Sequence, residues 1–168
     1  MSSQSMQRLV QGLCIFLFLS SAPALAQKEN PITWTVASEQ TAQPLKAGAT
    51  FKAQLTARIE ERWHLYAMEQ PQEGGPRPTR ILVPSGQPFT LDGKIDAPGP
   101  IRENDANFGF ETDYYEGSVT FEVPLRIAPT AEAGRQKAVV EVRFQTCNQE
   151  ICLPPKTLKL ELDVEIAK

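Results

Sequence analysis

Two cysteines near the C-terminus, Cys147 and Cys152, have the clearest potential for chemistry in this 168-residue chain. Four residues separate them in "FQTCNQEICLPP" (Phe144–Pro155), which ends in a double proline. Two thiols at this spacing can form a structural disulfide, bind a metal ion or act as a redox pair. Cysteines two residues apart at a helix N-terminus would have an activated thiol, but this extended, proline-ended segment begins no helix. As a redox pair, the cysteines are therefore better suited to be a disulfide that a partner's thiolate attacks, or a thiol pair that hands electrons on.

Other reaction classes find little support in the composition. The chain has one histidine, His64, and no G-x-S-x-G motif, which argues against hydrolase chemistry. A metal site would need both cysteines to converge with His64 and the distant Met68, so we expect neither a bound metal nor a cofactor. A net charge of −3 without a basic stripe excludes nucleic acid as a partner.

The N-terminal residues have the pattern of a secretory signal peptide. Arg8 precedes the apolar run Leu13–Leu19, and small residues lead to the A-x-A motif Ala24–Ala26. The run is too short for a stable membrane span, so we expect export to the periplasm with cleavage after Ala26. No other apolar run approaches membrane length, and we expect no membrane insertion after cleavage.

Removing residues 1–26 from the 168 leaves 142, a suitable size for one domain with its own core (27–168). Cys14 is lost with the signal peptide, so the mature chain keeps only the C-terminal pair. An exported pair enters an oxidising compartment, and we expect it to arrive as a disulfide.

The elements that position this pair are predicted to be β-strands. Apolar and polar residues alternate with a period of two, most clearly in "TLKLELDVEI", which is typical of strands with one buried face. Segments rich in proline and glycine at Pro71–Pro78 and Asp96–Pro100 indicate loops. Seven or eight short strands of this kind predict an all-β, immunoglobulin-like antiparallel β-sandwich. The predicted strands are Ile32–Val36, Thr50–Glu60, Trp63–Met68, Arg80–Val83, Ser118–Ile127, Ala138–Phe144 and Thr157–Ile166.

The cysteines lie in the connection between the last two predicted strands, most simply a hairpin. Opposed residues of an antiparallel pair have Cα atoms about 4.5–5.5 Å apart, which suits a disulfide. Val140, Val142 and Phe144 share a parity that should face the core, and Cys147 has the opposite parity. If the strand continues without a bulge, the Cys147 sulfur should face away from the core and be exposed.

Residue types and spacing leave three roles open for the pair. A structural disulfide that closes about six residues would stabilise the fold by roughly 2 kcal/mol, as part of a non-catalytic interaction module. A redox pair would exchange with partner thiols. A periplasmic Cu(I) carrier is the third alternative, because thiolates favour that ion.

The segment "VRFQTCNQEICLPP" resembles the active-site stretch of the N-terminal periplasmic domain of the thiol:disulfide interchange protein DsbD. "WHLYAM" and "ENDANFGFETDYYEGSVTFEVPL" are similar to that family's aromatic strand and its cap-loop region. The resemblance implies an immunoglobulin-like sandwich with a reversible disulfide, in which Cys152 forms the mixed disulfide with a partner and Cys147 resolves it. It also implies a mobile loop whose aromatic ring covers the disulfide, with Phe108 as first choice and Phe110 as competitor.

Four further residues flank the active site in this comparison: His64, Tyr66, Glu103 and Asp105. The implied partners are thioredoxin-like periplasmic proteins, and the family is linked to cytochrome c biogenesis. The chain ends at Lys168 without a transmembrane conduit or a thioredoxin-like domain, so we expect a separate membrane protein to supply the electrons.

Overall fold

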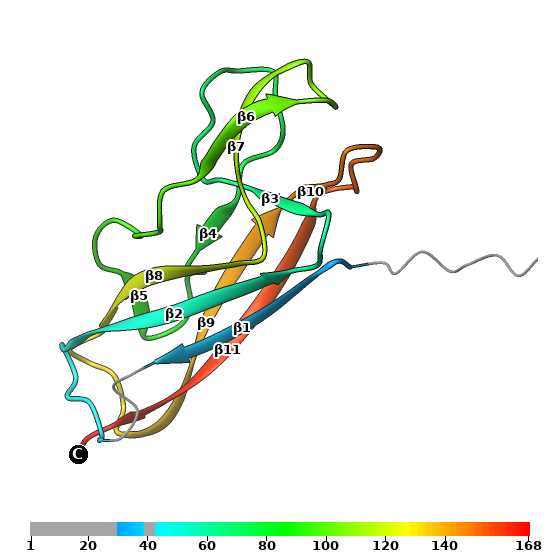
Figure 1. Cartoon of the computed structure of the whole chain (residues 1–168). Coiled ribbons are helices and arrows are strands. Elements are labelled where there is room, and N and C mark those ends of the chain that lie inside the picture. Colours follow the sequence, from blue (N-terminus) through cyan, green and yellow to red (C-terminus); the bar gives the residue numbers. More distant parts are fainter. Residues whose placement is uncertain (1–29, 39–42) are drawn as a thin grey trace, which may run out of the picture.

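The computed structural model describes residues 30–38 and 43–168. The expected signal peptide, its cleavage site and Cys14 lie outside these residues. In the described part the chain forms eleven strands and no helix (Figure 1). The strands are β1 (Ile32–Ser38), β2 (Thr50–Ile59), β3 (His64–Tyr66), β4 (Arg80–Leu82), β5 (Phe89–Leu91), β6 (Ile101–Asp105), β7 (Phe110–Tyr115), β8 (Ser118–Ile127), β9 (Gly134–Phe144), β10 (Thr146–Cys147) and β11 (Lys156–Ile166).

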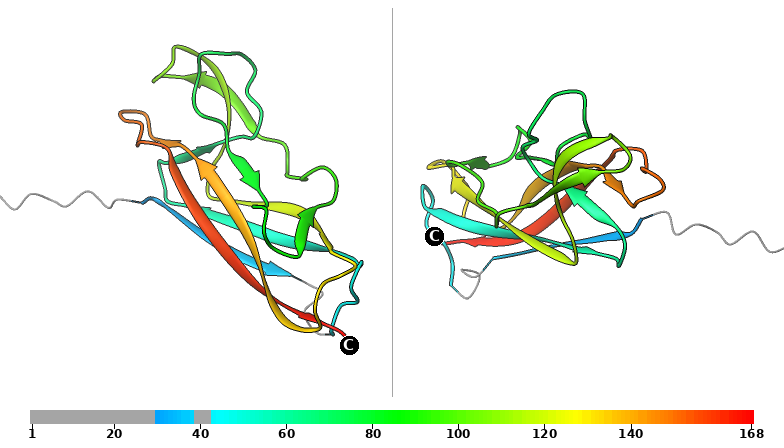
Figure 2. Two further views of the ribbon diagram at one scale, coloured as in Figure 1. Left: turned by 180° about the vertical axis from the view of Figure 1, so that it is seen from behind. Right: turned by 45° about the horizontal axis from the view of Figure 1, so that its top comes forward.

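Three antiparallel sheets share these strands. One has the order β1-β2-β8-β5 and a second the order β11-β9-β4. Figure 2 shows these two sheets as the layers of the sandwich, with β9 and β11 facing β1 and β2. A third, smaller sheet, β10-β3-β7-β6, stands at one end of the molecule.

The main core fills the space between the two larger layers. Alternation in β2 and β8 buries one face of each strand, with Leu55 and Phe121 fully buried, as the period-two pattern predicted. Trp34 of β1 links the layers, because its ring lies 5.9 Å from Phe121 of its own sheet and 5.5 Å from Phe144 of the other. The predicted all-β antiparallel sandwich is therefore confirmed.

Strand boundaries differ from the sequence prediction mainly in the third sheet. The expected strand Trp63–Met68 shortens to β3, and β5, β6, β7 and β10 were not predicted. The hairpin β6–β7, which we call the cap hairpin, pairs Ile101 with Tyr114 at one end and Asp105 with Phe110 at the other. Within the described ranges, no helix is long and apolar enough to cross a membrane.

Candidate functional site

The chain changes sheets immediately before the first cysteine. β9 ends at Phe144 in the sheet with β11, and β10 begins at Thr146 in the sheet with β3. Gln145 lies between them and ties this corner to a neighbouring loop, because its Oε1 accepts a hydrogen bond from the Arg77 amide at 2.8 Å. The change moves the following residues out of the sandwich and onto the small third sheet.

The predicted disulfide is formed between Cys147 and Cys152, and it closes a small hairpin of its own. Backbone hydrogen bonds of 2.9 Å flank the bridge on both sides, from Asn148 to Ile151 and from Leu153 to Thr146. The two cysteines are thus directly opposite each other as a non-hydrogen-bonded pair, the type in which the two strands lie closer together. Their Cα atoms are 4.0 Å apart.

The turn of this disulfide hairpin is shaped by the side chain of Asn148. Its Oδ1 accepts hydrogen bonds of 2.8 Å from the amides of Glu150 and Ile151. An asparagine that bonds the backbone two and three residues ahead stabilises a tight turn without help from neighbouring strands. The turn leaves Ile151 40% exposed beside Cys152.

The prediction that Cys147 is exposed is wrong: its exposed fraction is 0%. Cys147 does leave the main core, as its parity indicated, but it enters a second cluster with Tyr66 and Tyr114. Because the chain changes sheets at Gln145, Cys147 lies in the third sheet, where Tyr66, Tyr114 and Phe108 pack around it in place of water. Cys152 is only partly buried against this cluster, so the two cysteines differ in exposure.

The two candidate cap residues have different positions. Phe108, at the turn of the cap hairpin, packs against the cluster that holds Cys147, with its ring 6.0 Å from that of Tyr66 in an edge-to-face arrangement. Phe110 packs on Phe108 and on the loop Pro71–Pro78, where a Cβ added at Gly75 would come within 3.1 Å of the Phe110 ring. The geometry therefore favours Phe108 as the ring over the disulfide cluster.

A side-chain hydrogen bond joins the cap hairpin to the disulfide hairpin. Asn107 Nδ2 donates to the carbonyl oxygen of Asn148 at 2.7 Å, while the Asn107 amide donates to Asp105 Oδ1 at 2.8 Å. Gly109, with a φ of 75°, completes the turn and donates its amide to the Asp105 carbonyl. The tip of the cap is thus held over the turn that carries the cysteines.

The predicted flanking residues His64, Tyr66 and Asp105 form a buried hydrogen-bonded chain. The Tyr66 hydroxyl donates to Asp105 Oδ2 at 2.7 Å and lies 3.0 Å from His64 Nε2. Thr112 also donates to Asp105 Oδ2 at 3.1 Å. Because Tyr66 gives its only proton to Asp105, His64 Nε2 must be the donor to the tyrosine oxygen. Nδ1 is then the nitrogen that gains or loses the titrating proton.

Glu103 and Asp105 differ in their surroundings. Asp105 is 5% exposed and belongs to the buried chain, so it does not lie on a solvated loop face. Glu103 is exposed and accepts a hydrogen bond of 3.1 Å from the Tyr114 hydroxyl. Both residues lie on β6 and, two positions apart, point to the same face of the strand. Asp105 is the buried one because it lies at the end of β6, where Tyr66 and Thr112 donate hydrogen bonds to it.

The electrostatics of the site follow from these contacts. Burial alone would raise the pKa of Asp105, but hydrogen bonds from Tyr66, the Asn107 amide and Thr112 hold that pKa below its usual value. Burial and the neighbouring Asp105 raise the pKa of Tyr66, so this tyrosine stays protonated. Burial lowers the pKa of His64 although Asp105 opposes the effect, which favours the neutral imidazole near pH 7.

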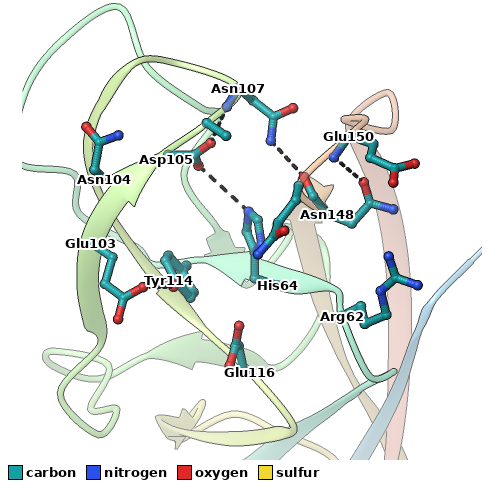
Figure 3. Close-up of a pocket in the computed structure, with 12 residues that line it drawn as sticks. Arg62, His64, Glu103, Asn104, Asp105, Asn107, Tyr114, Glu116, Asn148 and Glu150 are labelled. Carbon is teal, nitrogen blue, oxygen red and sulfur yellow. Dashed lines mark hydrogen bonds and ion pairs between the residues drawn. The ribbon is translucent and has the colours of Figure 1, made fainter.

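A pocket of about 220 Å³ lies between the cap hairpin and the disulfide hairpin. Figure 3 shows His64 pointing into it toward Asp105, with Asn107 bonded to Asn148 across its far side. Its walls are Arg62, His64, Glu103, Asn104, Asp105, Ala106, Asn107, Tyr114, Glu116, Asn148, Gln149 and Glu150. Among the described residues, no group of three or more His, Cys, Asp or Glu side chains is arranged to hold a metal ion.

Comparison with known proteins identifies the family. The model of the family described as "Thiol:disulfide interchange protein DsbD, N-terminal" matches residues 34–164. This chain belongs to that family. The match includes both cysteines, the cap hairpin and β3, so the family was correctly predicted from the sequence.

Two solved structures share the fold. The N-terminal domain of DsbD from Neisseria meningitidis, in the reduced form, is similar with a TM-score of 0.50 and 15% identity, covering 84% of this chain and 90% of that one. The N-terminal periplasmic domain of ScsB from Proteus mirabilis is similar with a TM-score of 0.56 and 18% identity, covering 84% of this chain and 51% of that one. No curated protein matches the sequence. The sandwich is therefore immunoglobulin-like, as predicted.

Sequence reasoning missed several residues that shape the site, namely Asn107, Thr112, Tyr114 and Asn148. Asn148 could have been found, because an asparagine that follows a cysteine in a four-residue connection is a common turn former. The other three become part of the site only through the pairing of β6 with β7, which the sequence pattern did not reveal. The roles of the site residues in exchange stay predictions.

Proposed function

We propose that this protein is a periplasmic thiol–disulfide exchange module whose Cys147–Cys152 disulfide accepts electrons and passes them on. One observation carries the proposal: the disulfide lies on a separate hairpin outside the main core, with Cys147 fully buried and Cys152 only partly buried beneath an aromatic cap. A disulfide that only stabilised the fold would gain nothing from this arrangement, whereas an exchanging one needs a single sulfur within reach of a partner. Membership of a family described as a thiol:disulfide interchange protein supports it.

The exchange begins at Cys152. A thiolate of a reduced thioredoxin-like partner attacks the Cys152 sulfur, the Cys147–Cys152 bond breaks, and the bonding electron pair leaves on the Cys147 sulfur. The partner's second thiol loses its proton, attacks the partner's own sulfur in the mixed disulfide and releases the Cys152 thiolate. The partner ends as a disulfide, and this chain ends with two thiols after taking up two protons.

Electrons leave by the same steps in reverse. Cys152 attacks a disulfide of the acceptor, and the Cys147 thiolate then attacks Cys152 and expels the reduced acceptor. We propose that the acceptors are thioredoxin-like periplasmic proteins, including those of cytochrome c biogenesis, and that a separate membrane protein supplies the electrons.

The cap controls access between encounters. Phe108 packs against the buried cluster while Asn107 holds the cap tip to Asn148, so a partner must displace this hairpin to reach the disulfide. An apolar ring over a disulfide limits the approach of a solvated thiolate. This shielding limits reduction by thiols that do not displace the hairpin.

The proposed location is the periplasm, reached through a signal peptide at residues 1–26 that is cleaved after Ala26. The charged, apolar and small-residue segments of the N-terminus support this, and the related ScsB domain is described as periplasmic. We propose that the mature domain is not inserted into the membrane.

The burial of Cys147 also favours a second candidate, an interaction module with a structural disulfide. The two functions differ in the reduction potential of the bond. A structural disulfide is expected below about −300 mV, whereas an exchanging one should lie near the potentials of periplasmic oxidoreductases, at about −120 to −230 mV. Equilibration with glutathione or dithiothreitol buffers measures this potential, and a value below about −300 mV would contradict the exchange function.

A trapping experiment tests the order of attack. Cys147→Ser leaves Cys152 as the only thiol of the mature domain. A thioredoxin-like protein whose single cysteine is held as a mixed disulfide with thionitrobenzoate should react with Cys152, release thionitrobenzoate and leave a stable mixed disulfide between the two proteins. The matched variant Cys152→Ser leaves the fully buried Cys147, which should react much more slowly. Equal trapping of both variants would contradict the proposed roles.

A further inference from the structure

The buried position of Cys147 leaves its proton without direct access to water. The side chain is 0% exposed, and its cluster consists of Tyr66, Tyr114, Phe108 and Cys152. When a partner attacks Cys152, the leaving Cys147 sulfur carries a negative charge into this enclosed position. An unpaired buried charge is costly, so the exchange needs a proton donor or acceptor inside the cluster.

We infer that His64 holds this proton, giving it to the Cys147 thiolate when the disulfide opens and taking it back when Cys147 resolves a mixed disulfide. The inference rests on the proposed exchange function and adds to it a residue that handles the proton.

The strand register places His64 in the required position. Cys147 of β10 and His64 of β3 are direct antiparallel partners. Directly opposed residues point to the same face of the sheet, with Cβ atoms about 4.5–5.5 Å apart. Tyr66, two residues further along β3, shares this face and contacts Cys147 within the buried cluster. His64 therefore lies beside the reacting sulfur rather than behind it.

His64 also reaches the solvent side of the site. It is 9% exposed and forms part of the wall of the pocket between the cap hairpin and the disulfide hairpin (Figure 3). A proton received from Cys147 can leave through this pocket. In the described part of the chain, His64 is the only side chain that both opposes Cys147 and ordinarily titrates near neutral pH.

The hydrogen-bonded chain orients the imidazole for this role. The Tyr66 hydroxyl accepts a hydrogen bond from His64 Nε2 and donates one to Asp105. These bonds fix the imidazole ring and leave Nδ1 to exchange the proton. The Tyr114 ring, 4.7 Å from the imidazole, packs against the ring's face. The same arrangement would be unnecessary for a histidine that only filled space.

The titratable and charged groups around His64 permit both its neutral and its protonated form. Tyr66 shares its strand and Tyr114 faces it from β7. A single cation, Arg62, lines the same pocket. Asp105 on β6 favours the imidazolium, and three further carboxylates line the same pocket: Glu103 on β6, Glu116 after β7 and Glu150 in the disulfide turn. Burial opposes the imidazolium and keeps the ring neutral in the resting protein. A histidine balanced in this way can accept a proton and release it again.

The proton balance is closed in each direction. On reduction, neutral His64 first takes a proton from water in the pocket. The partner thiolate then forms a bond to Cys152, the Cys147 thiolate leaves, and the imidazolium gives it that proton and becomes neutral again. On resolution, neutral His64 takes the proton from the Cys147 thiol, and the thiolate attacks Cys152 and expels the partner thiolate. His64 then exchanges its proton with water in the pocket.

The first test uses the fact that His64 is the only histidine of the chain. In the reduced, untagged protein, the NMR signals of its ring should titrate in two steps, its own and that of the Cys147 thiol, because the two groups share a proton. Cys147→Ser should remove the second step, and Cys152→Ser should retain it. A single step in the reduced wild-type protein, or a second step that follows Cys152 instead, would overturn the inference.

The second test measures rates. The rate constant of disulfide reduction by dithiothreitol is compared between wild type and His64→Gln from about pH 5 to about pH 9. The ratio of the two constants cancels the titration of dithiothreitol itself. The rate constant of the wild type divided by that of His64→Gln should be about tenfold or more at acidic pH, where the imidazolium is present, and should fall toward one as pH rises. Thr90→Gln, on the exposed face of β5, serves as the control.

The outcomes separate the two proposals. A ratio that is constant with pH means that His64 acts only through structure and overturns the inference, while the exchange function stands. Failure of a reduced thioredoxin-like protein to open the wild-type disulfide would refute the exchange function. The dithiothreitol comparison would then still decide the role of His64. If His64→Gln does not fold, the titration of the wild-type protein decides alone.

Discussion

Replacing Phe108 by alanine should make the disulfide much easier to reduce. The ring is half-buried against the cluster around Cys147, and full burial of a phenylalanine is worth about 1.5–3 kcal/mol, so the closed cap loses about 1 kcal/mol. The edge-to-face contact with Tyr66 adds about another 1 kcal/mol. Together these losses of about 2 kcal/mol raise the population of the open cap roughly thirtyfold, at about 1.4 kcal/mol per factor of ten.

The assay is the second-order rate constant for reduction of the oxidised domain by glutathione, followed by quenching and alkylation of free thiols. If cap opening precedes attack, Phe108→Ala should increase this constant by about the same thirtyfold, since the rate follows the open population. Phe110→Ala is the matched control, because that ring packs on Gly75 rather than on the disulfide cluster. Equal acceleration by both variants, or none by Phe108→Ala, would refute the assignment of the cap.

Three further outcomes are expected from the same contacts. Tyr66→Phe removes the hydroxyl that bonds both His64 and Asp105, and it should lower the free energy of unfolding by about 2 kcal/mol in urea titrations. A loss below about 0.5 kcal/mol would show that these hydrogen bonds do not stabilise the fold. Gly75→Ala should lower the free energy of unfolding by about 1 kcal/mol, because the added Cβ presses on the Phe110 ring. Gly99→Ala is the control and should be neutral, since no atom lies within 4 Å of its added Cβ. Equal losses in the two variants would contradict the packing of Phe110 on Gly75. Acid should destabilise the oxidised protein in two stages. Because folding lowers the pKa of His64, the free energy of unfolding should fall as pH drops below about 6.5. Folding also lowers the pKa of Asp105, so the free energy of unfolding should fall again below about 3.8. Urea midpoints that do not fall between pH 7 and pH 3 would contradict both shifts.

The sandwich was predictable because its strands carry their own signal. In β2 and β8 every second side chain enters the same core, so burial appears directly as alternation in the sequence. β6 has no such signal, since four of its five residues are exposed and only Asp105 is buried. It is a strand because β7 pairs with it, and pairing between distant segments is not encoded in a local pattern.

The site was predictable in its chemistry but not in its burial. The cysteine spacing and the adjacent prolines indicated a disulfide, and the structure contains it. The parity argument failed for Cys147 because parity holds only within one continuous strand, and the chain changes sheets at Gln145. The family resemblance placed Asp105 beside the active site, but no feature of the sequence indicated that it is buried. Its burial depends on Tyr66 and Thr112, which reach it from two other strands.

The division of the core into two parts reconciles a stable fold with a bond that opens and closes. The main core holds the two large sheets together without either cysteine, whereas Cys147 belongs to a separate cluster with Tyr66 and Tyr114. A disulfide closing so short a loop contributes only about 2 kcal/mol, a small share of what the main core supplies. We therefore expect reduction to alter the small cluster and the cap above it, while the sandwich remains the fixed support for the proposed exchange.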